Sequence, residues 1–274
     1  MLSVVITSCH DDKAAYLTAF SIAAQLEQLQ APHEIIIVAD GGTPLKWENK
    51  GFRCLRGSFG SPQASRDAGI KAARYADVLL LESHVVLDDV AKLLIEHQYQ
   101  HAALTFCSRR AEGPEMFDVY GSTVDWEKTL WYKRLLYEPF AQQPYRIGQF
   151  GHSCFMLDRE WYLSSGGYTD LMKGWGAEEP FLCLKAWMLG RECWFVPGVA
   201  HYHFLSAGAH ADQILGQDER YKRNFQILNY VIAGRPMLGA TPGIEAERQK
   251  MVQGPFGGDI ERLRQYFERE GVVA

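Results

Sequence analysis

Short runs of apolar residues alternate with segments of helical periodicity through the first hundred residues of the chain. The runs Leu2–Thr7, Glu34–Ala39 and Val78–Leu81 are rich in aliphatic side chains, as expected of strands buried on both faces of a sheet. Between them, Ala14–Leu29 and Ser61–Tyr75 carry apolar residues at helical spacing. Strands that alternate with helices in this way predict βαβ units, because parallel neighbours need a crossover connection.

The rest of the chain extends this pattern less regularly. Residues 110–150, rich in aromatic residues and proline, are predicted to form a long excursion from the sheet. Residues 205–217 are predicted to form a mobile loop, and residues 234–258 an extended strap rich in Gly and Pro. We expect an α/β fold with a mostly parallel central sheet flanked by helices and a C-terminal helical extension. Further strands are predicted at 52–55, 102–108, 153–157 and 193–196, and further helices at 87–97, 159–165, 178–189, 218–232 and 259–270.

The composition argues against several classes of protein. The 274 residues carry a formal net charge of −5, so no global basic field is present to hold nucleic acid. The six cysteines form no C-x-x-C pair, which argues against a structural zinc site or a disulfide framework and favours reduced thiols. No apolar run approaches the ~20 residues of a membrane span, and the N-terminal run lacks the basic flank of a signal peptide. We therefore expect a cytoplasmic protein without a transmembrane segment.

Polar side chains follow three of the predicted strands at the points where they end. Ser8–Asp11, Asp40–Gly42 and Glu82–His84 come directly after apolar runs. The carboxyl ends of parallel strands meet at one edge of a sheet, where ligands bind in folds of this class. Further on, the glycine-rich turn Gly174–Glu179 ends in two carboxylates, and His201–His203 closes another apolar run. Acids, imidazoles and glycine at strand ends favour a metal-assisted transfer site.

The order of these elements resembles that of the GT-A nucleotide-sugar glycosyltransferases, family 2 and its relatives, over about residues 2–205. Ser3–Thr7 and Glu34–Gly42 look like the first two strands of that family. Ser61–Ile70 is similar to the family's helix that begins near an arginine and an asparagine, although Asp67 stands where asparagine is usual.

Two further segments carry the resemblance. Glu82-Ser83-His84 occupies the place of the metal-binding Asp-x-Asp and is closest to the Asp-x-His of polypeptide N-acetylgalactosaminyltransferases. Gly174–Glu179 resembles the Trp-Gly-Gly-Glu-Asp segment of β-1,4-galactosyltransferases, and His203 falls where such enzymes carry a late metal-ligand histidine. Each segment is loose by itself, but their order along the chain is fairly specific.

The resemblance implies a metal site at Glu82, His84 and His203. A carboxylate combined with imidazoles suits Mn²⁺ better than Mg²⁺, which prefers oxygen ligands alone. His201 is the rival of His203, because residues two apart on a strand share a face. The alternative interpretation is that Glu82 is a helix-capping or surface acid and His84 a polar loop residue.

The resemblance also implies the residues that bind the sugar donor. Asp40 is expected at the nucleotide base or ribose, Thr7 at the base through its backbone, and Arg66 at the diphosphate. Glu82 is expected to reach the donor as well, and Trp175 to stack on a sugar face. Without the resemblance, Asp40 is an ordinary turn residue and Arg66 a partner in an ion pair on the helix surface.

Glu178 and Glu179 are the expected catalytic acids. By position in related inverting enzymes, Glu179 would take the proton of the acceptor hydroxyl and Glu178 would bind acceptor or donor sugar. The pair favours inversion, but glutamate in place of aspartate leaves the stereochemistry open. Without the resemblance, the pair is an acid-rich helix N-terminus with Pro180 at an early position.

The resemblance therefore predicts a metal-dependent enzyme that moves a hexosyl or N-acetylhexosaminyl group from a nucleoside diphosphate sugar, most simply a UDP-sugar, to a hydroxyl of a glycan or polysaccharide. Residues 1–205 would form the catalytic domain, with a nucleotide-binding half at 1–100 and an acceptor half at 101–205; residues 206–274 would add a lid loop and helical tail. Alternatives are transfer to a modified base in DNA, the one role expected for nucleic acid, a nucleotidyltransferase, and a non-catalytic nucleotide-sugar-binding protein.

Overall fold

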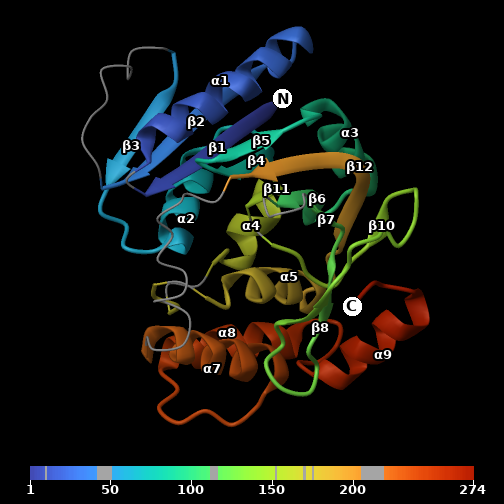
Figure 1. Ribbon diagram of the computed structural model, residues 1–274. Coiled ribbons are helices and arrows are strands. Elements are labelled where there is room, and N and C mark those ends of the chain that lie inside the picture. Colours follow the sequence, from blue (N-terminus) through green and yellow to red (C-terminus); the bar gives the residue numbers. More distant parts are fainter. Residues whose placement is uncertain are drawn as a thin grey trace.

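The protein is built around one twisted sheet, seen in a computed structural model that describes residues 1–9, 11–41, 51–111, 117–151, 153–168, 171–174, 176–204 and 219–274 (Figure 1). The strand order is β10-β12-β6-β11-β4-β1-β2-β3, with β5 paired to β12 and β7 to β6. The strands of this sheet are β1 (Leu2–Cys9), β2 (His33–Asp40), β3 (Arg53–Gly57), β4 (Asp77–Glu82), β5 (Val85–Leu87), β6 (Leu104–Ala111), β7 (Phe117–Val119), β10 (Tyr145–Arg146), β11 (Cys154–Asp158) and β12 (Cys193–His203).

The sheet is mostly parallel, as the alternating pattern predicts. The neighbours β1–β2, β1–β4, β2–β3 and β6–β12 are parallel, whereas β11 runs antiparallel between β4 and β6. The predicted fold class is therefore confirmed. The flanking helices are α1 (Asp12–Gln28), α2 (Pro62–Ala72), α3 (Val90–Gln100), α4 (Arg159–Ser165), α5 (Glu178–Met188), α7 (Glu219–Ala233), α8 (Pro242–Gln253) and α9 (Ile260–Glu270).

Helices cover both faces of the sheet, which explains the nearly unbroken apolar runs of its strands. On β1, Val4 and Ile6 face the apolar cluster that α1 and α3 complete, whereas Val5 faces the cluster that contains α2, α4 and α5. Gly69 lets α2 approach the sheet closely, because a Cβ there would lie 2.3 Å from Cγ1 of Val5. This close packing holds the first turns of α2 over the carboxyl ends of β1 and β4.

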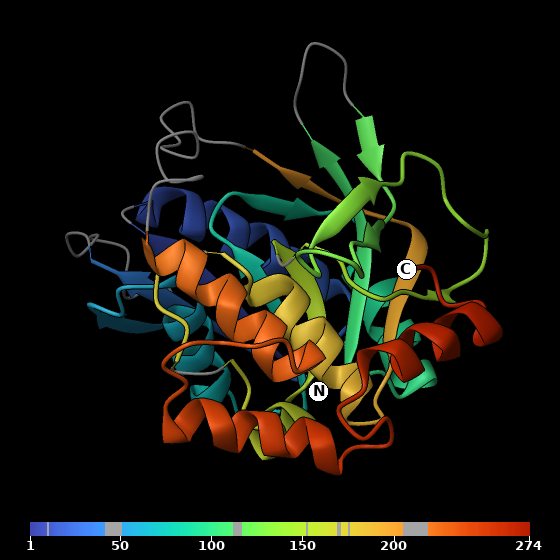
Figure 2. The same cartoon turned by 90° about the horizontal axis from the view of Figure 1, so that it is seen from below.

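The C-terminal helices form a further layer beneath α5 (Figure 1) and lie in front when the molecule is seen from below (Figure 2). Apolar side chains of α7, α8 and α9 belong to the same buried cluster as those of α5, among them Leu228, Met251 and Phe267. No described helix is both long and apolar enough to cross a membrane.

Two segments differ from the sequence-based expectation. The predicted strap at residues 234–258 is wrong, because α8 begins after Thr241, whose side chain caps it with Pro242 at its first position. Most of the glycine and proline of this segment lies outside the helix or at its ends, where both residues are tolerated. The predicted excursion at 110–150 contains short strands, including the separate hairpin of β8 (Ser122–Val124) and β9 (Tyr132–Leu135). The predicted mobile loop at 205–217 lies outside the described residues.

A buried ion pair connects α5 to α8. Lys185 is fully buried, and its Nζ donates to the carbonyl of Gly167 at 3.0 Å and to Oε2 of Glu247 at 3.2 Å. Burial lowers the pKa of Lys185 to about 8, although the charge of Glu247 opposes that shift. Glu247 has a second cationic partner, Lys250, at 2.6 Å.

We expect Glu247→Ala to lower the free energy of unfolding by about 3 kcal/mol or more, because it strands the Lys185 ammonium in the core. Lys185→Met should cost much less, because it removes the buried charge and leaves Glu247 paired with Lys250. Urea denaturation of both variants measures the two costs. A larger loss in Lys185→Met than in Glu247→Ala would contradict this account.

Candidate active site

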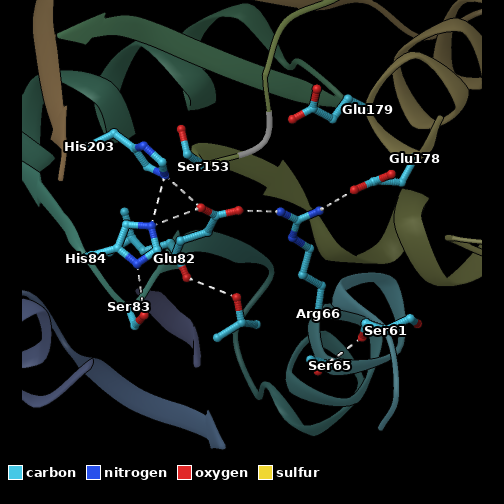
Figure 3. A network of polar contacts seen from close by, with 12 residues as sticks. Ser61, Ser65, Arg66, Glu82, Ser83, His84, Ser153, Glu178, Glu179 and His203 are labelled. Carbon is cyan, nitrogen blue, oxygen red and sulfur yellow. Dashed lines mark hydrogen bonds and ion pairs between the residues drawn. The ribbon is translucent and has the colours of Figure 1, made fainter. Parts of the chain in front are cut away.

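Glu82, His84 and His203 come together at the carboxyl edge of the sheet (Figure 3). Nε2 of His203 lies 2.8 Å from Oε2 of Glu82 and 3.1 Å from Nε2 of His84. Nε2 of His84 lies 3.6 Å from the same carboxylate oxygen. One ligand atom from each residue thus falls within 4.8 Å of the other two. The three sequence-predicted metal ligands converge on one point.

Strand pairing explains this convergence. Glu82 ends β4, and the turn that follows carries His84 into β5. Strand β12 pairs antiparallel with β5 so that His203 lies opposite Val85, the residue after His84. Two elements separated by more than a hundred residues are therefore held at the same edge by backbone hydrogen bonds.

The electrostatics of the cluster keep Glu82 and His84 in the forms that ligate cations. Burial raises the pKa of Glu82, but the hydrogen bond with His203 and the charge of Arg66 outweigh it and bring the pKa to about 2. Burial also lowers the pKa of His84, against the opposing effect of Glu82. At neutral pH the site therefore offers a carboxylate and a neutral imidazole.

His201 does not join this cluster. Its Nε2 lies 2.8 Å from Oγ of Ser153 and its Nδ1 lies 3.4 Å from Sγ of Cys107. Burial lowers the pKa of His201 to about 3. His201 shares a strand face with His203, but a rise of ~6.6 Å for two residues leaves it one step deeper in the sheet. The sequence favours His203 as the ligand and keeps His201 as its rival, and the structure brings His203, not His201, to Glu82.

Arg66 is buried and lies between two carboxylates. Its Nη2 donates to Oε1 of Glu82 at 2.9 Å, and its Nη1 lies 3.9 Å from Oε1 of Glu178 (Figure 3). Burial would lower the pKa of Arg66, but Tyr168 and the surrounding carboxylates raise it above its ordinary value. The alternative of an ion pair on the helix surface is wrong, because the Arg66 side chain is only 3% exposed. Arg66 connects the predicted metal ligands to the predicted catalytic acids.

Glu178 and Glu179 begin α5 but occupy different environments. Glu178 is buried and accepts a hydrogen bond from the backbone N–H of Gly176 at 2.7 Å. Burial raises the pKa of Glu178 to about 7, although Arg66 opposes that rise. Glu179 is half-buried and accepts a hydrogen bond from the hydroxyl of Tyr132. Ala177, which precedes the pair, has φ 66°, and this left-handed residue turns the chain into the helix.

The remaining predicted donor residues are placed as follows. Asp40 ends β2 and its carboxylate accepts from the backbone N–H groups of Phe59 and Gly60, at 2.8 and 3.1 Å. Thr7 pairs with Glu82 across β1 and β4, and its hydroxyl lies 3.5 Å from the carbonyl of Leu81. Trp175 lies outside the described residues. Asp40 thus organises the loop before α2, and its contact with a nucleotide stays a prediction.

Two residues of the site were not identified from the sequence. Tyr132 belongs to the aromatic-rich 110–150 segment, and its hydrogen bond to Glu179 forms only in the folded chain. Arg109 lies 3.2 Å from Nδ1 of His203 through its Nη2. The consecutive arginines Arg109 and Arg110 at the end of a predicted strand were the available signal, because charge is unusual there.

Because the pKa of Glu178 is raised, its carboxylate form destabilises the fold. Below the ordinary value of 4.5 the carboxyl is protonated in both folded and unfolded states, so stability falls as pH rises from about 4.5 through about 7. The Gln variant cannot ionise at this position. The unfolding free energy of Glu178→Gln minus that of wild type should therefore increase by at least ~1.4 kcal/mol between pH 5 and pH 8, the value of one pKa unit. Urea denaturation at both pH values measures this gain, and a pH-independent difference would contradict it.

No family model matches the chain. It is 24% identical over 254 residues to polypeptide N-acetylgalactosaminyltransferase 8 of Drosophila melanogaster, covering 84% of this chain and 42% of that protein. It is 25% identical over 232 residues to putative polypeptide N-acetylgalactosaminyltransferase 13 of the same organism, covering 72% of this chain and 40% of that protein. The chain thus spans less than half the length of these curated relatives.

Solved structures share the fold. GalNAc-T7, crystallised with UDP, GalNAc and Mn²⁺, superposes with a TM-score of 0.70 at 18% identity, over 100% of this chain and 55% of that one. Residues 1–349 of TarS from S. aureus in complex with UDP-GlcNAc give a TM-score of 0.55 at 14% identity, over 99% of this chain and 92% of that one. The chain has the GT-A fold, and its sequence is similar to those of polypeptide N-acetylgalactosaminyltransferases.

Proposed function

We propose that this protein is a metal-dependent glycosyltransferase that moves a sugar from a UDP-sugar to a hydroxyl acceptor. The observation that carries the proposal is the group formed by Glu82, His84 and His203 beside a buried arginine, at the ligand-binding edge of a GT-A sheet. GalNAc-T7 with UDP and Mn²⁺, and TarS with UDP-GlcNAc, support a UDP-sugar as the donor.

The three proposed metal ligands fit a divalent transition metal. Their ligand atoms approach one another within 4.8 Å, and one carboxylate with two imidazoles is a donor set that suits Mn²⁺. When bound, the cation would offset the negative charge that develops on the departing diphosphate. Glu82, His84 and His203 would hold it.

Arg66 is the proposed positioning residue for the donor. The guanidinium fixes the Glu82 carboxylate at 2.9 Å, so this ligand cannot rotate away from the two histidines. The same guanidinium lies 3.9 Å from the carboxylate of Glu178, which is buried and is proposed to contact a sugar hydroxyl. Its raised pKa allows the Glu178 carboxyl to carry a proton near neutral pH, so that it can donate as well as accept.

Glu179 is the proposed general base. In the reaction, the acceptor oxygen forms a bond to the anomeric carbon, the bond from that carbon to the diphosphate oxygen breaks, and Glu179 receives the hydroxyl proton. Tyr132 donates to Oε2 of Glu179 and orients the carboxylate. Gly151 lies beside the carboxylate, because a Cβ at this position would be in ordinary van der Waals contact with Oε1, at 3.6 Å. Direct displacement of this kind inverts the anomeric centre.

A glycan or polysaccharide is the proposed acceptor. Trp131 of the 110–150 segment stacks on Phe225 of α7 and contacts Tyr132, the partner of Glu179, so aromatic side chains of the kind that sugars contact lie next to the proposed base. Transfer to a modified base in DNA is disfavoured by the net charge of −5.

We expect UDP with Mn²⁺ to stabilise the protein against heat, by about 2.7 kcal/mol at 100 times the dissociation constant. Glu82→Gln and His203→Ala should each remove most of the Mn²⁺-dependent part, because each deletes a metal ligand. Thermal melts with UDP alone, Mn²⁺ alone and both ligands measure this dependence. Glu96→Gln on α3 is the matched control and should melt like wild type. The absence of any shift with nucleotide and metal would exclude a UDP-sugar donor.

Glu179→Gln is expected to bind UDP and Mn²⁺ like wild type but to lose at least ~100-fold in transfer rate, the lower end of the usual contribution of a general base. Tyr132→Phe keeps the carboxylate and should lose much less. Donor turnover in the presence of candidate glycan acceptors measures both rates. Full turnover by Glu179→Gln would show that another group accepts the proton. If wild type binds UDP-sugar but neither transfers nor hydrolyses it, the protein is a non-catalytic nucleotide-sugar-binding protein.

A further inference from the structure

Arg109 is a cation next to the proposed metal site, and it has no anionic partner among the described residues. It lies near the end of β6, directly opposite His201 of β12, and its side chain is half-buried. Within the described part of the chain, its buried Nε makes no hydrogen bond, and its Nη2 lies 3.2 Å from Nδ1 of His203. No described carboxylate lies within ion-pair distance of Arg109. The neighbouring Arg110, in contrast, forms a bidentate pair with Asp118, at 2.6 and 2.8 Å.

The contact between Arg109 and His203 opposes ligation of a metal by His203. A guanidinium has only N–H donors, so Nδ1 of His203 must accept, and the ring hydrogen of the neutral imidazole must then lie on Nε2. That hydrogen points to Oε2 of Glu82, 2.8 Å away. To bind a cation through Nε2, His203 needs the other tautomer, with its hydrogen on Nδ1. In that tautomer two N–H groups would face each other at 3.2 Å.

Glu82, the acid of the described cluster, is not free to pair with Arg109. Glu82, the nearest acid of the cluster, already accepts from Arg66 on Oε1 and contacts His203 on Oε2. A metal-ligating histidine usually donates its second N–H to a carboxylate, a carbonyl or water, not to a guanidinium. An incoming diphosphate would supply the anion that Arg109 lacks, in the bidentate geometry that guanidinium groups favour.

We propose that Arg109 couples metal binding to donor binding, an inference that rests on the proposed function. In the free protein its guanidinium occupies Nδ1 of His203 and holds this histidine in the tautomer that cannot ligate a metal through Nε2. When the donor enters, Arg109 moves to the diphosphate, and His203 becomes a ligand. Metal and nucleotide therefore bind cooperatively, and the site has little affinity for free cations.

The test measures Mn²⁺ and UDP affinities separately and together, by isothermal titration calorimetry at one pH. Arg109→Met keeps an unbranched, flexible side chain but removes its charge and donors. We expect this variant to bind Mn²⁺ without UDP at least about fivefold more tightly than wild type, and UDP without Mn²⁺ more weakly. The factor by which UDP raises Mn²⁺ affinity should fall at least about fivefold, the lower end of common coupling strengths. Opposite changes in the two affinities cannot result from general destabilisation.

Arg110→Met is the matched control, because it removes the same charge from the adjacent residue, whose partners are Asp118 and Tyr202. It should leave both affinities within about twofold of wild type. A similar gain in Mn²⁺ affinity in both variants would attribute the effect to net charge and overturn the role of Arg109.

A second measurement needs only the wild-type protein. Nitrogen-15 NMR of the His203 ring should report hydrogen on Nε2 in the free protein. After addition of UDP with the diamagnetic cation Cd²⁺, it should report hydrogen on Nδ1. The same tautomer in both states would overturn the inference.

The possible outcomes separate the inference from the proposed function. If wild type binds Mn²⁺ only weakly even with UDP, the proposed function fails, and the inference fails with it. If wild type binds both ligands but Arg109→Met has unchanged coupling, only the inference fails.

Discussion

The candidate site depends on the two contacts that the Glu82 carboxylate makes, one with Arg66 and one with His203. One oxygen accepts from Arg66 of α2, and the other contacts His203 of β12, so a single side chain at the end of β4 holds together three distant parts of the chain. Removing this group would take away the carboxylate at 2.9 Å from the buried guanidinium and leave the more distant Glu178, at 3.9 Å. Buried charges persist only where they are paired, so Glu82 ionisation and Arg66 burial depend on each other.

The acceptor side of the site depends on the layers beneath it. The turn before α5 is held by α7, where Asn224 bonds to the backbone of Lys173 and to the carbonyl of Gly176. The ring of Tyr221 packs on Gly176, where a Cβ would lie 2.4 Å from that ring. Helix α8 then fixes α5 through the buried pair of Lys185 with Glu247. The C-terminal helices therefore contribute to the site indirectly, because they fix the start of α5 and with it the positions of Glu178 and Glu179.

The carboxylates of Glu82 and Glu178 both lie near Arg66 but occupy different electrostatic environments. Glu82 stays ionised because His203 and Arg66 surround it, whereas Glu178 resists ionisation because burial dominates over the more distant Arg66. The same guanidinium thus has different effects on two carboxylates, since its distance is 2.9 Å to one and 3.9 Å to the other. Neither shift follows from residue type, because glutamate has the same ordinary pKa in both positions.

The sequence by itself determined the sheet, its parallel strands and the edge at which polar residues gather. Aliphatic runs such as Leu2–Thr7 and local capping signals such as Ser61-Pro62 are local properties, and the structure contains the strand and the capped helix. The strap expected at 234–258 was wrong because its glycines and prolines were counted without regard to the helix start at Thr241-Pro242. Those signals act over a few residues and need no partner.

Only the tertiary structure decided which of the candidate groups meet. His201 and His203 share one strand face in the sequence pattern, and the register of β12 on β5 brings His203, not His201, to His84. Arg66 is buried because Glu82 and Glu178 reach it from other elements, and Tyr132 reaches Glu179 from a segment without a recognisable pattern. The contact of Arg109 with Nδ1 of His203 joins residues 94 positions apart and depends on the pairing of β6 with β12. Such contacts depend on strand register and packing between distant segments, which residue type and spacing along the chain do not determine.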